Sequence, residues 1–206
     1  MSTKNAGQLP SSFTPDGRRL FFFEPPPDGG GFDIWTLPLM NDGAAVRPGP
    51  AEPFLEGGQI GLGRALAVSP DGRWLAYDQR GPPEPEVYVQ LFATSSSTPG
   101  SRLQISNNGG DWPVWSRTAH ELFYSSAGNI MAVPYTVKGD TFVADRPRIW
   151  ARLPAGIARE GFDLAPDGRR GVVAAPVEEA QEQIEQSHVT FLLNFFDELR
   201  RRVPAR

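Results

Sequence analysis

The stretch that decides the fold is Val68-Ser69-Pro70-Asp71-Gly72-Arg73-Trp74-Leu75-Ala76-Tyr77. In it, Pro70 presets φ for a turn, Asp71 can accept hydrogen bonds from backbone amides ahead of it, and Gly72 tolerates a positive φ. An apolar strand follows directly. The stretch therefore predicts a β-hairpin between two short strands.

The same pattern occurs four times along the 206 residues. The copies align on Asp16, Asp71, Thr118 and Asp167, which are 55, 47 and 49 residues apart. This period fits a four-stranded propeller blade rather than a helical repeat. The third copy reads Arg117-Thr118-Ala119, so we expect a looser or different turn there. The other three keep the turn residues, which are Pro15, Asp16 and Gly17, then Pro70, Asp71 and Gly72, then Pro166, Asp167 and Gly168.

Further strands are expected after each turn. An apolar strand comes first, a second follows a polar or Pro/Gly-rich loop, and an outer strand fits at residues 52–55, 102–105 and 148–153. Large apolar side chains occur on both alternating faces, as in a sheet that lies between two others. We expect an all-β propeller, partial or open, with four blade repeats at approximately 12–56, 64–106, 111–154 and 161–196.

The two ends of the chain are expected to differ from the blades. Residues 1–11 offer no convincing strand and are expected to be disordered. Residues 194–203 are expected to form a short C-terminal helix, because acidic residues come early and three arginines come late, which complements the helix dipole. An insert rich in Glu and Gln at 177–186 interrupts the last blade as a loop or short helix.

An open ring would leave one face uncovered on the first and on the last blade. Apolar side chains would then meet water and favour self-association or docking onto missing blades. Terminal repeats normally carry a polar outer face, which alternation does not show here. The side chains concerned are Phe21, Phe23, Trp35, Leu37, Val172 and Leu192, or their alternating neighbours.

The amino-acid composition excludes some classes of binding partner. The formal net charge is −4 and the 20 basic residues are scattered apart from a cluster at 200–202, which argues against nucleic acid. There is no cysteine, which excludes disulfides and thiolate metal sites but leaves the compartment open. No signal peptide or membrane span is visible, so the chain is cytoplasmic as written, or extracytoplasmic if it belongs to a membrane kinase.

The Ser-Pro-Asp-Gly-Arg turn, the Leu-Ala-Tyr strand after it, and the later Asp-Ile-Trp or Glu-Val-Tyr strand resemble the WD40-like repeat of TolB-type propellers, often called PD40. The resemblance covers residues 12–196. The Gly-His and Trp-Asp dipeptides of true WD40 blades are missing. The resemblance implies a TolB-like propeller and a role in protein binding.

A narrower resemblance covers Leu103 to Ser116, Glu121 to Tyr124, Ile130 to Val133 and Val189 to Leu199. These segments resemble the C-terminal propeller of certain bacterial serine/threonine protein kinases, where the propeller is a sensor beyond the kinase domain. Phe195 stands where that family usually has Trp. Kinase activity cannot be transferred to this chain, because its only lysines are Lys4 and Lys138 and it has no glycine-rich loop or His-Arg-Asp loop.

Other catalytic or metal chemistry is also not expected. No Gly-x-Ser-x-Gly elbow occurs. His120 and His188 lie 68 residues apart in non-equivalent blade positions, and the turn aspartates already have a structural use. We therefore expect no metal, no cofactor and no catalytic residue. A glycine-rich stretch could suggest a phosphate-binding loop, but a flexible connection between blades is the better interpretation. Its glycines are Gly57, Gly58, Gly61 and Gly63.

Asp111 and Trp112 are the candidate binding residues. They follow Gly109-Gly110 and begin the innermost strand of the third blade, so they could lie at the mouth of a central channel, where propeller ligands often bind. Trp115 in the same strand reads as core.

Three functions remain open. The first is a non-catalytic interaction or sensor domain, as the C-terminal part or a relative of a kinase-linked propeller. The second is a periplasmic TolB-like scaffold that binds proteins, and the third is the accessory propeller of a hydrolase. The ligand and the partner cannot be named from the sequence.

Overall fold

The computed structural model describes residues 7–26, 30–41, 43, 45–60, 65–81, 83–92, 102–153 and 162–173. All of them lie in the compact unit Met1–Pro176. They form strands, turns and loops, and no helix occurs among them. The chain is therefore all-β over its described part, as the spacing of the repeats predicts.

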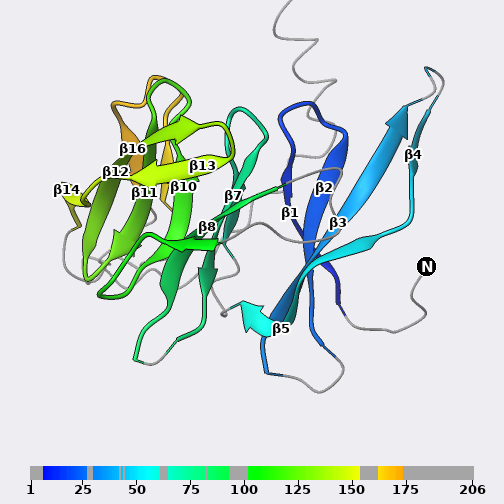
Figure 1. The fold of residues 1–206 in the computed structure, drawn as a ribbon, viewed down its shortest axis with the longest axis horizontal. Coiled ribbons are helices and arrows are strands. Elements are labelled where there is room, and N and C mark those ends of the chain that lie inside the picture. The colour runs from blue at the N-terminus through cyan, green and yellow to red at the C-terminus, as the bar shows by residue number, and fades with distance from the viewer. Residues whose placement is uncertain are drawn as a thin grey trace, which may run out of the picture. The chain divides into compact units, whose positions relative to one another are not determined.

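The first blade is an antiparallel sheet in the order β1-β2-β3-β5 (Figure 1). Its strands are β1 (Leu9–Phe13), β2 (Arg19–Glu24), β3 (Phe32–Asn41) and β5 (Glu52–Ile60). The short strand β4 (Val46–Pro48) pairs with the end of β3.

The second and third blades repeat this order, and two strands of the fourth are described. In the second blade the strands are β6 (Leu66–Val68), β7 (Trp74–Gln79), β8 (Glu86–Leu91) and β9 (Arg102–Gln104). In the third they are β10 (Asp111–Trp115), β11 (Glu121–Ser126), β12 (Asn129–Lys138), β13 (Thr141–Ala144) and β14 (Arg148–Arg152). In the fourth they are β15 (Phe162–Leu164) and β16 (Gly171–Val173). The four repeats are therefore four blades of a partial propeller.

The three Pro-Asp-Gly turns share one hydrogen-bond scheme. Each glycine lies at positive φ, 67° at Gly17, 73° at Gly72 and 67° at Gly168. Its N–H donates to the carbonyl three residues back, over 2.8 to 2.9 Å. The aspartate Oδ1 accepts the N–H two residues ahead, over 3.0 to 3.1 Å. These local bonds explain why the motif recurs.

The side chain at the start of each turn adds a further bond in the first two blades. The Thr14 hydroxyl donates to Asp16 Oδ1 over 2.6 Å, and the Ser69 hydroxyl donates to Asp71 Oδ1. The hydrogen bond from Thr14 holds the pKa of Asp16 below its ordinary value. In the fourth blade the backbone N–H of Arg169 lowers the pKa of Asp167.

The third turn uses different hydrogen bonds, as its sequence predicts. Ser116 Oγ accepts the N–H groups of Thr118 and Ala119 over 3.3 and 3.1 Å. Ser116 N–H still donates to the carbonyl of Glu121, which matches the strand-closing bond of the other turns. A serine side chain therefore replaces the aspartate as the acceptor of the turn.

Alternate faces of the sheets pack against neighbouring blades. Phe21, Phe23 and Ile34 pack against Leu75 and Tyr77 of the second blade. Apolar clusters of the same kind join the second blade to the third, and the third to the fourth. The core of the molecule is thus divided among the joints between blades, as in other repeat architectures.

Two expectations at the first blade need correction. Strand β1 begins at Leu9, inside the segment expected to be disordered, because residues 9–13 form the innermost strand and pair with β2. Phe21 and Phe23 do not meet water but are 0% and 2% exposed, because they face the second blade. Val172 of the last blade is 66% exposed, as expected.

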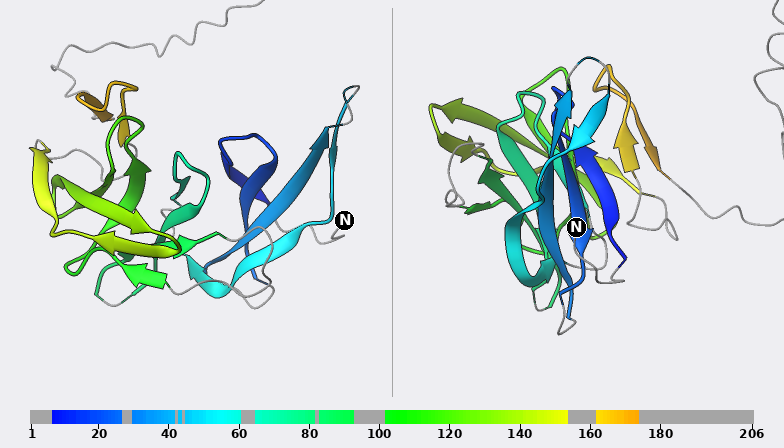
Figure 2. Two further views of the ribbon diagram at one scale, coloured as in Figure 1. Left: turned by 45° about the horizontal axis from the view of Figure 1, so that its top comes forward. Right: turned by 90° about the vertical axis from the view of Figure 1, so that its right-hand side faces the viewer.

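Sequence patterns did not predict the long hairpins of the first and third blades. Strand β3 continues past its sheet and turns back as β4, and β12 does the same with β13. Both hairpins can be followed in Figure 2, the first in blue to cyan and the second in yellow-green. The expected strand at 188–193, the insert at 177–186 and the helix at 194–203 lie outside the described residues.

Candidate ligand groove at the innermost strands

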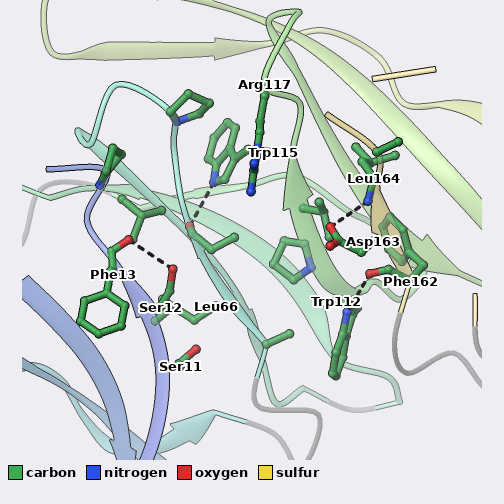
Figure 3. A pocket seen from close by; sticks show the side chains of 18 of the residues that line it. Ser11, Ser12, Phe13, Leu66, Trp112, Trp115, Arg117, Phe162, Asp163 and Leu164 are labelled. Atoms are coloured by element: carbon green, nitrogen blue, oxygen red, sulfur yellow. Dashed lines mark hydrogen bonds between the residues drawn. The ribbon is translucent and has the colours of Figure 1, made fainter. Parts of the chain in front are cut away.

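The innermost strands of all four blades line one groove (Figure 3). Successive strands β1, β6, β10 and β15 lie next to one another along it. Within the described residues each of these strands pairs with a single neighbour, so each has an edge that no other strand pairs with. The groove has a volume of about 990 Å³, which is large enough for a small molecule or a peptide segment.

The wall of the groove is mixed in character. It is apolar at Phe13 and Leu66 and polar at the hydroxyls of Ser11 and Ser12. Two of the residues that line the groove are charged. They are Arg117 of the third blade and Asp163 of the fourth. The Asp163 carboxylate also accepts the N–H of Leu164 over 2.8 Å, which fixes its orientation.

Trp112 is one of the residues that line the groove. Its φ is 55°, a left-handed conformation that is rare for a bulky residue. The indole N–H donates to the carbonyl of Phe162 over 3.2 Å, and the ring packs in the cluster between the third and fourth blades. Trp112 thus contributes both to the groove and to a blade joint.

Asp111 is placed differently. It is half-buried, it pairs with Ser125 in the β10–β11 ladder, and it is not among the residues that line the groove. A bulge follows it between Asp111 and Val114. The bulge lets Trp112 leave the regular alternation of the strand.

The segment before Asp111 is held by the second blade. Glu86 accepts the N–H of Gly109 over 3.1 Å and the hydroxyl hydrogen of Ser106. A Cβ at Gly110 would lie 2.5 Å from Ser106 Oγ, so only glycine fits there without a shift of the neighbour. The Gly-Gly-Asp-Trp motif is therefore a tight connection between blades that delivers Trp112 to the groove.

A buried carboxyl supports the start of β6. Asp78 is 1% exposed, and its Oδ1 accepts the N–H of Ala65 over 2.9 Å. Ala65 in turn lines the groove. Burial raises the pKa of Asp78 to about 6.

Sequence reasoning missed Ser11, Ser12, Arg117 and Asp163. The repeat alignment contains the signal for two of them, since Ser12 and Asp163 stand two residues before the turn-opening Thr14 and Ala165. Arg117 stands where the other repeats have the turn proline. Its guanidinium therefore takes the place of a proline ring at the rim.

The remaining sequence candidates lie elsewhere. His120 packs beside the ring of Tyr135, with centroids 5.4 Å apart, and His188 lies outside the described residues. Gly57 is part of strand β5, and Gly61 and Gly63 lie outside the described part of the chain. Among the residues that the structure describes, no cluster of His, Cys, Asp and Glu could hold a metal ion.

Comparisons with known proteins show similarity to solved structures only. No family model matches the sequence, and no curated protein matches it. TolB from Acinetobacter baumannii is similar in structure, with 16% identity and a TM-score of 0.49 over 84% of this chain and 39% of TolB. A candidate 6-phosphogluconolactonase from Bacteroides uniformis gives 11% identity and a TM-score of 0.46 over 84% of this chain and 64% of that one.

This chain therefore spans about two fifths of TolB and less than two thirds of the second protein. The assignment to the propeller class rests on the blade pairing and the joints described above. Helices able to cross a membrane by length and apolarity are not found in the described ranges.

Proposed function

We propose that this chain is a non-catalytic β-propeller interaction domain that binds an extended polypeptide segment in the groove of its innermost strands. The observation that carries the proposal is that four innermost strands, each paired with another strand on one side alone in the described residues, line one groove together with Trp112. Free strand edges offer backbone hydrogen bonds to an extended peptide, and side pockets select its residues.

The side chains that line the groove indicate which residues a bound peptide should carry. Arg117 and Asp163 offer one charge of each sign, so the segment carries at least one acidic and one basic side chain. The indole of Trp112 supplies a large apolar contact, which is typical of residues that dominate binding energy. An apolar residue is therefore expected between the charged ones.

The test is selection of peptides from a random displayed library against the purified chain, followed by calorimetry. Arg117→Ala should weaken the selected peptides by about tenfold or more, as expected for a charge-assisted hydrogen bond. Arg146→Ala is the matched control, because Arg146 is also exposed but does not line the groove. Equal loss in both variants, or no selected peptide, would contradict the groove as the binding site.

A sensory role for this domain is suggested by the resemblance to kinase-linked propellers. The segment from Leu103 to Ser116, which delivers Trp112 to the groove, is part of that resemblance. The chain would then report the bound peptide to a kinase domain. Reading the neighbouring coding sequence tests this, since a kinase frame upstream supports it and a signal peptide instead supports a TolB-like periplasmic scaffold.

The proposal includes the absence of catalysis. Purified protein should show no ATP hydrolysis, phosphotransfer or esterase activity above buffer, because the sequence has none of the required nucleophile, base or phosphate-loop arrangements. Turnover that follows the protein through purification would overturn this. Turnover that needs a second chain would support the accessory propeller of a hydrolase.

A further inference from the structure

The third turn differs from the other three at four consecutive positions, 117–120, and all four residues line a second cavity. This cavity has a volume of about 320 Å³ and lies between the second and third turns. Departures from a repeated pattern are expected where a position serves function rather than folding. The cavity is therefore a candidate binding site. Its other lining residues are Pro70, Asp71, Ser116, Tyr135 and Val137.

The cavity adjoins the groove of the innermost strands. Pro70 and Arg117 line both spaces, so they form the boundary between them. In Figure 3 the side chain of Arg117 extends from its turn toward the groove. The volume of the cavity is at the lower limit for a small-molecule pocket, so it can hold one long side chain of a segment bound in the groove.

Asp71 gives the cavity an acceptor that the fold does not use. Its Oδ1 accepts the Ser69 hydroxyl hydrogen and the N–H of Arg73, whereas its Oδ2 accepts no hydrogen bond from the described residues. The guanidinium of Arg73 points elsewhere, because its Nη2 donates to Gly139 O and to Asp140 Oδ1 over 2.9 and 2.6 Å. The carboxylate of Asp71 therefore has one oxygen available to a ligand.

The fourth turn shows which group suits such an oxygen. There, Asp167 Oδ2 accepts the Nε–H of Arg170 over 3.0 Å. Trp74 stands at the position of Arg170 in the second turn, so Asp71 has no cation of this kind in its own turn. A basic side chain from outside could take the corresponding place and form a charge-assisted hydrogen bond.

The rest of the cavity also suits a basic side chain. Pro70 and Val137 offer apolar contact to a methylene stem, which long basic side chains bury readily. Burial raises the pKa of Tyr135 to about 12, and the negative charge of Asp71 raises it further. The phenol of Tyr135 therefore stays neutral at pH 7 and can accept a hydrogen bond from a ligand.

We propose that this cavity binds a lysine or arginine side chain of the peptide held in the groove, with its charged end beside Asp71. The inference rests on the proposed function and adds a basic position to the peptide. Because Arg117 borders both spaces, this basic residue should lie within about two positions of the acidic residue that Arg117 attracts, since an extended chain advances about 3.3 Å per residue.

The peptides selected from the displayed library test the inference. Their sequences should share a lysine or arginine near the acidic residue. Replacing this basic residue by norleucine removes the charge and keeps an apolar stem. The replacement should weaken binding to the parent chain by about fivefold, and should have little effect on binding to Asp71→Asn.

Two control variants should keep the fivefold effect. Asp16→Asn is the matched control for the turn, because Asp16 Oδ1 accepts the same two bonds, from Thr14 and Arg18, and does not line the cavity. Asp163→Asn is the control for the groove, because Asp163 lines the groove but not the cavity.

A second variant covers the case in which Asp71→Asn disturbs its turn. Tyr135→Phe removes the hydroxyl and keeps the ring, so it should also reduce the norleucine effect. Selected peptides without a shared basic residue, or a norleucine effect that persists in both cavity variants or is lost in either control, would overturn the inference and leave the groove proposal intact. If no peptide is selected, the groove proposal fails and this inference fails with it.

Discussion

At the scale of single residues, the turn between β6 and β7 has several local hydrogen bonds within residues 69–73. Asp71→Ala removes the acceptor for the Ser69 hydroxyl and for Arg73 N–H, and should lower the free energy of unfolding by about 1 kcal/mol. Gly72→Val places a β-branched residue at φ 73° and should cost about 2 kcal/mol. Thermal melts of both variants measure the losses.

Asparagine gives a matched control at both positions. Asp71→Asn keeps an acceptor oxygen, and Gly72→Asn keeps a residue that tolerates positive φ, so each should lose less than its partner variant. If Ala and Asn at position 71 were equally harmful, the acceptor role of the carboxylate would be wrong.

Asp78 makes stability depend on pH in a defined direction. The pKa is raised to about 6 in the folded protein, whereas an unfolded aspartate has a pKa of about 3.9. Between these values the folded state binds more protons than the unfolded state, so stability falls as pH rises through this window. Above pH 6 the full penalty is present, about 3 kcal/mol for a shift of roughly two units.

Asp78→Asn should therefore be more stable than the parent at pH 7 and gain little at pH 4. Urea unfolding of both proteins at the two pH values measures the difference. The comparison cancels the opposite effect of Asp16 and Asp167, whose lowered pKa values remove stability as pH falls. An equal difference at both pH values would show that the carboxyl of Asp78 is not the titrating group.

At the scale of the elements, the β12–β13 hairpin should stabilise the joint between the second and third blades. Phe142 is half-buried against Trp74, Trp115 and Tyr135, so Phe142→Ala should cost about 2 kcal/mol, below the range for a fully buried Phe. Val143, its neighbour in the same strand, is 48% exposed. Val143→Ala should change the unfolding free energy by less than about 0.5 kcal/mol.

Urea unfolding followed by tryptophan fluorescence measures both changes. Trp74 and Trp115 lie in the joint, so their emission reports on it directly. Similar losses in the two variants would mean that the hairpin contributes through its backbone pairing rather than through the ring of Phe142.

The sequence predicts the elements that depend on local rules. Pro70, Asp71 and Gly72 specify their turn through bonds within five residues, so the motif marks a hairpin wherever it occurs. The third turn is found from its flanking strands alone, because Ser116 replaces the aspartate. Strand β1 is missed because Leu9-Pro10-Ser11-Ser12-Phe13 has weak alternation and is fixed by its pairing with β2.

The candidate site is less predictable because its contacts are not local. Trp112 is placed at the groove by its position in the repeat, but its left-handed φ and its bond to Phe162 depend on a residue 50 positions away. Likewise, the burial of Phe21 depends on which face of the first blade meets the second. Alternation shows that one face is covered but does not say which.

At the scale of the whole molecule, the joints between blades carry most of the core, so apolar side chains that no joint covers matter for stability. Each inner blade is covered on both sides by a neighbour. The first blade is exposed at Phe13 and Val46, and the fourth at Val172. Association that covers these side chains should therefore stabilise the folded chain by mass action.

The melting temperature of the parent chain should accordingly rise with protein concentration. A tenfold increase adds about 1.4 kcal/mol per dimer, or about 0.7 kcal/mol per chain, and should raise Tm by about 2 °C for a protein of this size. Val172→Lys should melt at a lower temperature that does not depend on concentration, because its folded monomer gains nothing from mass action. Calorimetric scans at several concentrations measure both, and Ile149→Lys should follow the parent. A concentration-independent Tm in the parent would show that folding and association are not coupled, and the prediction of self-association would then be wrong.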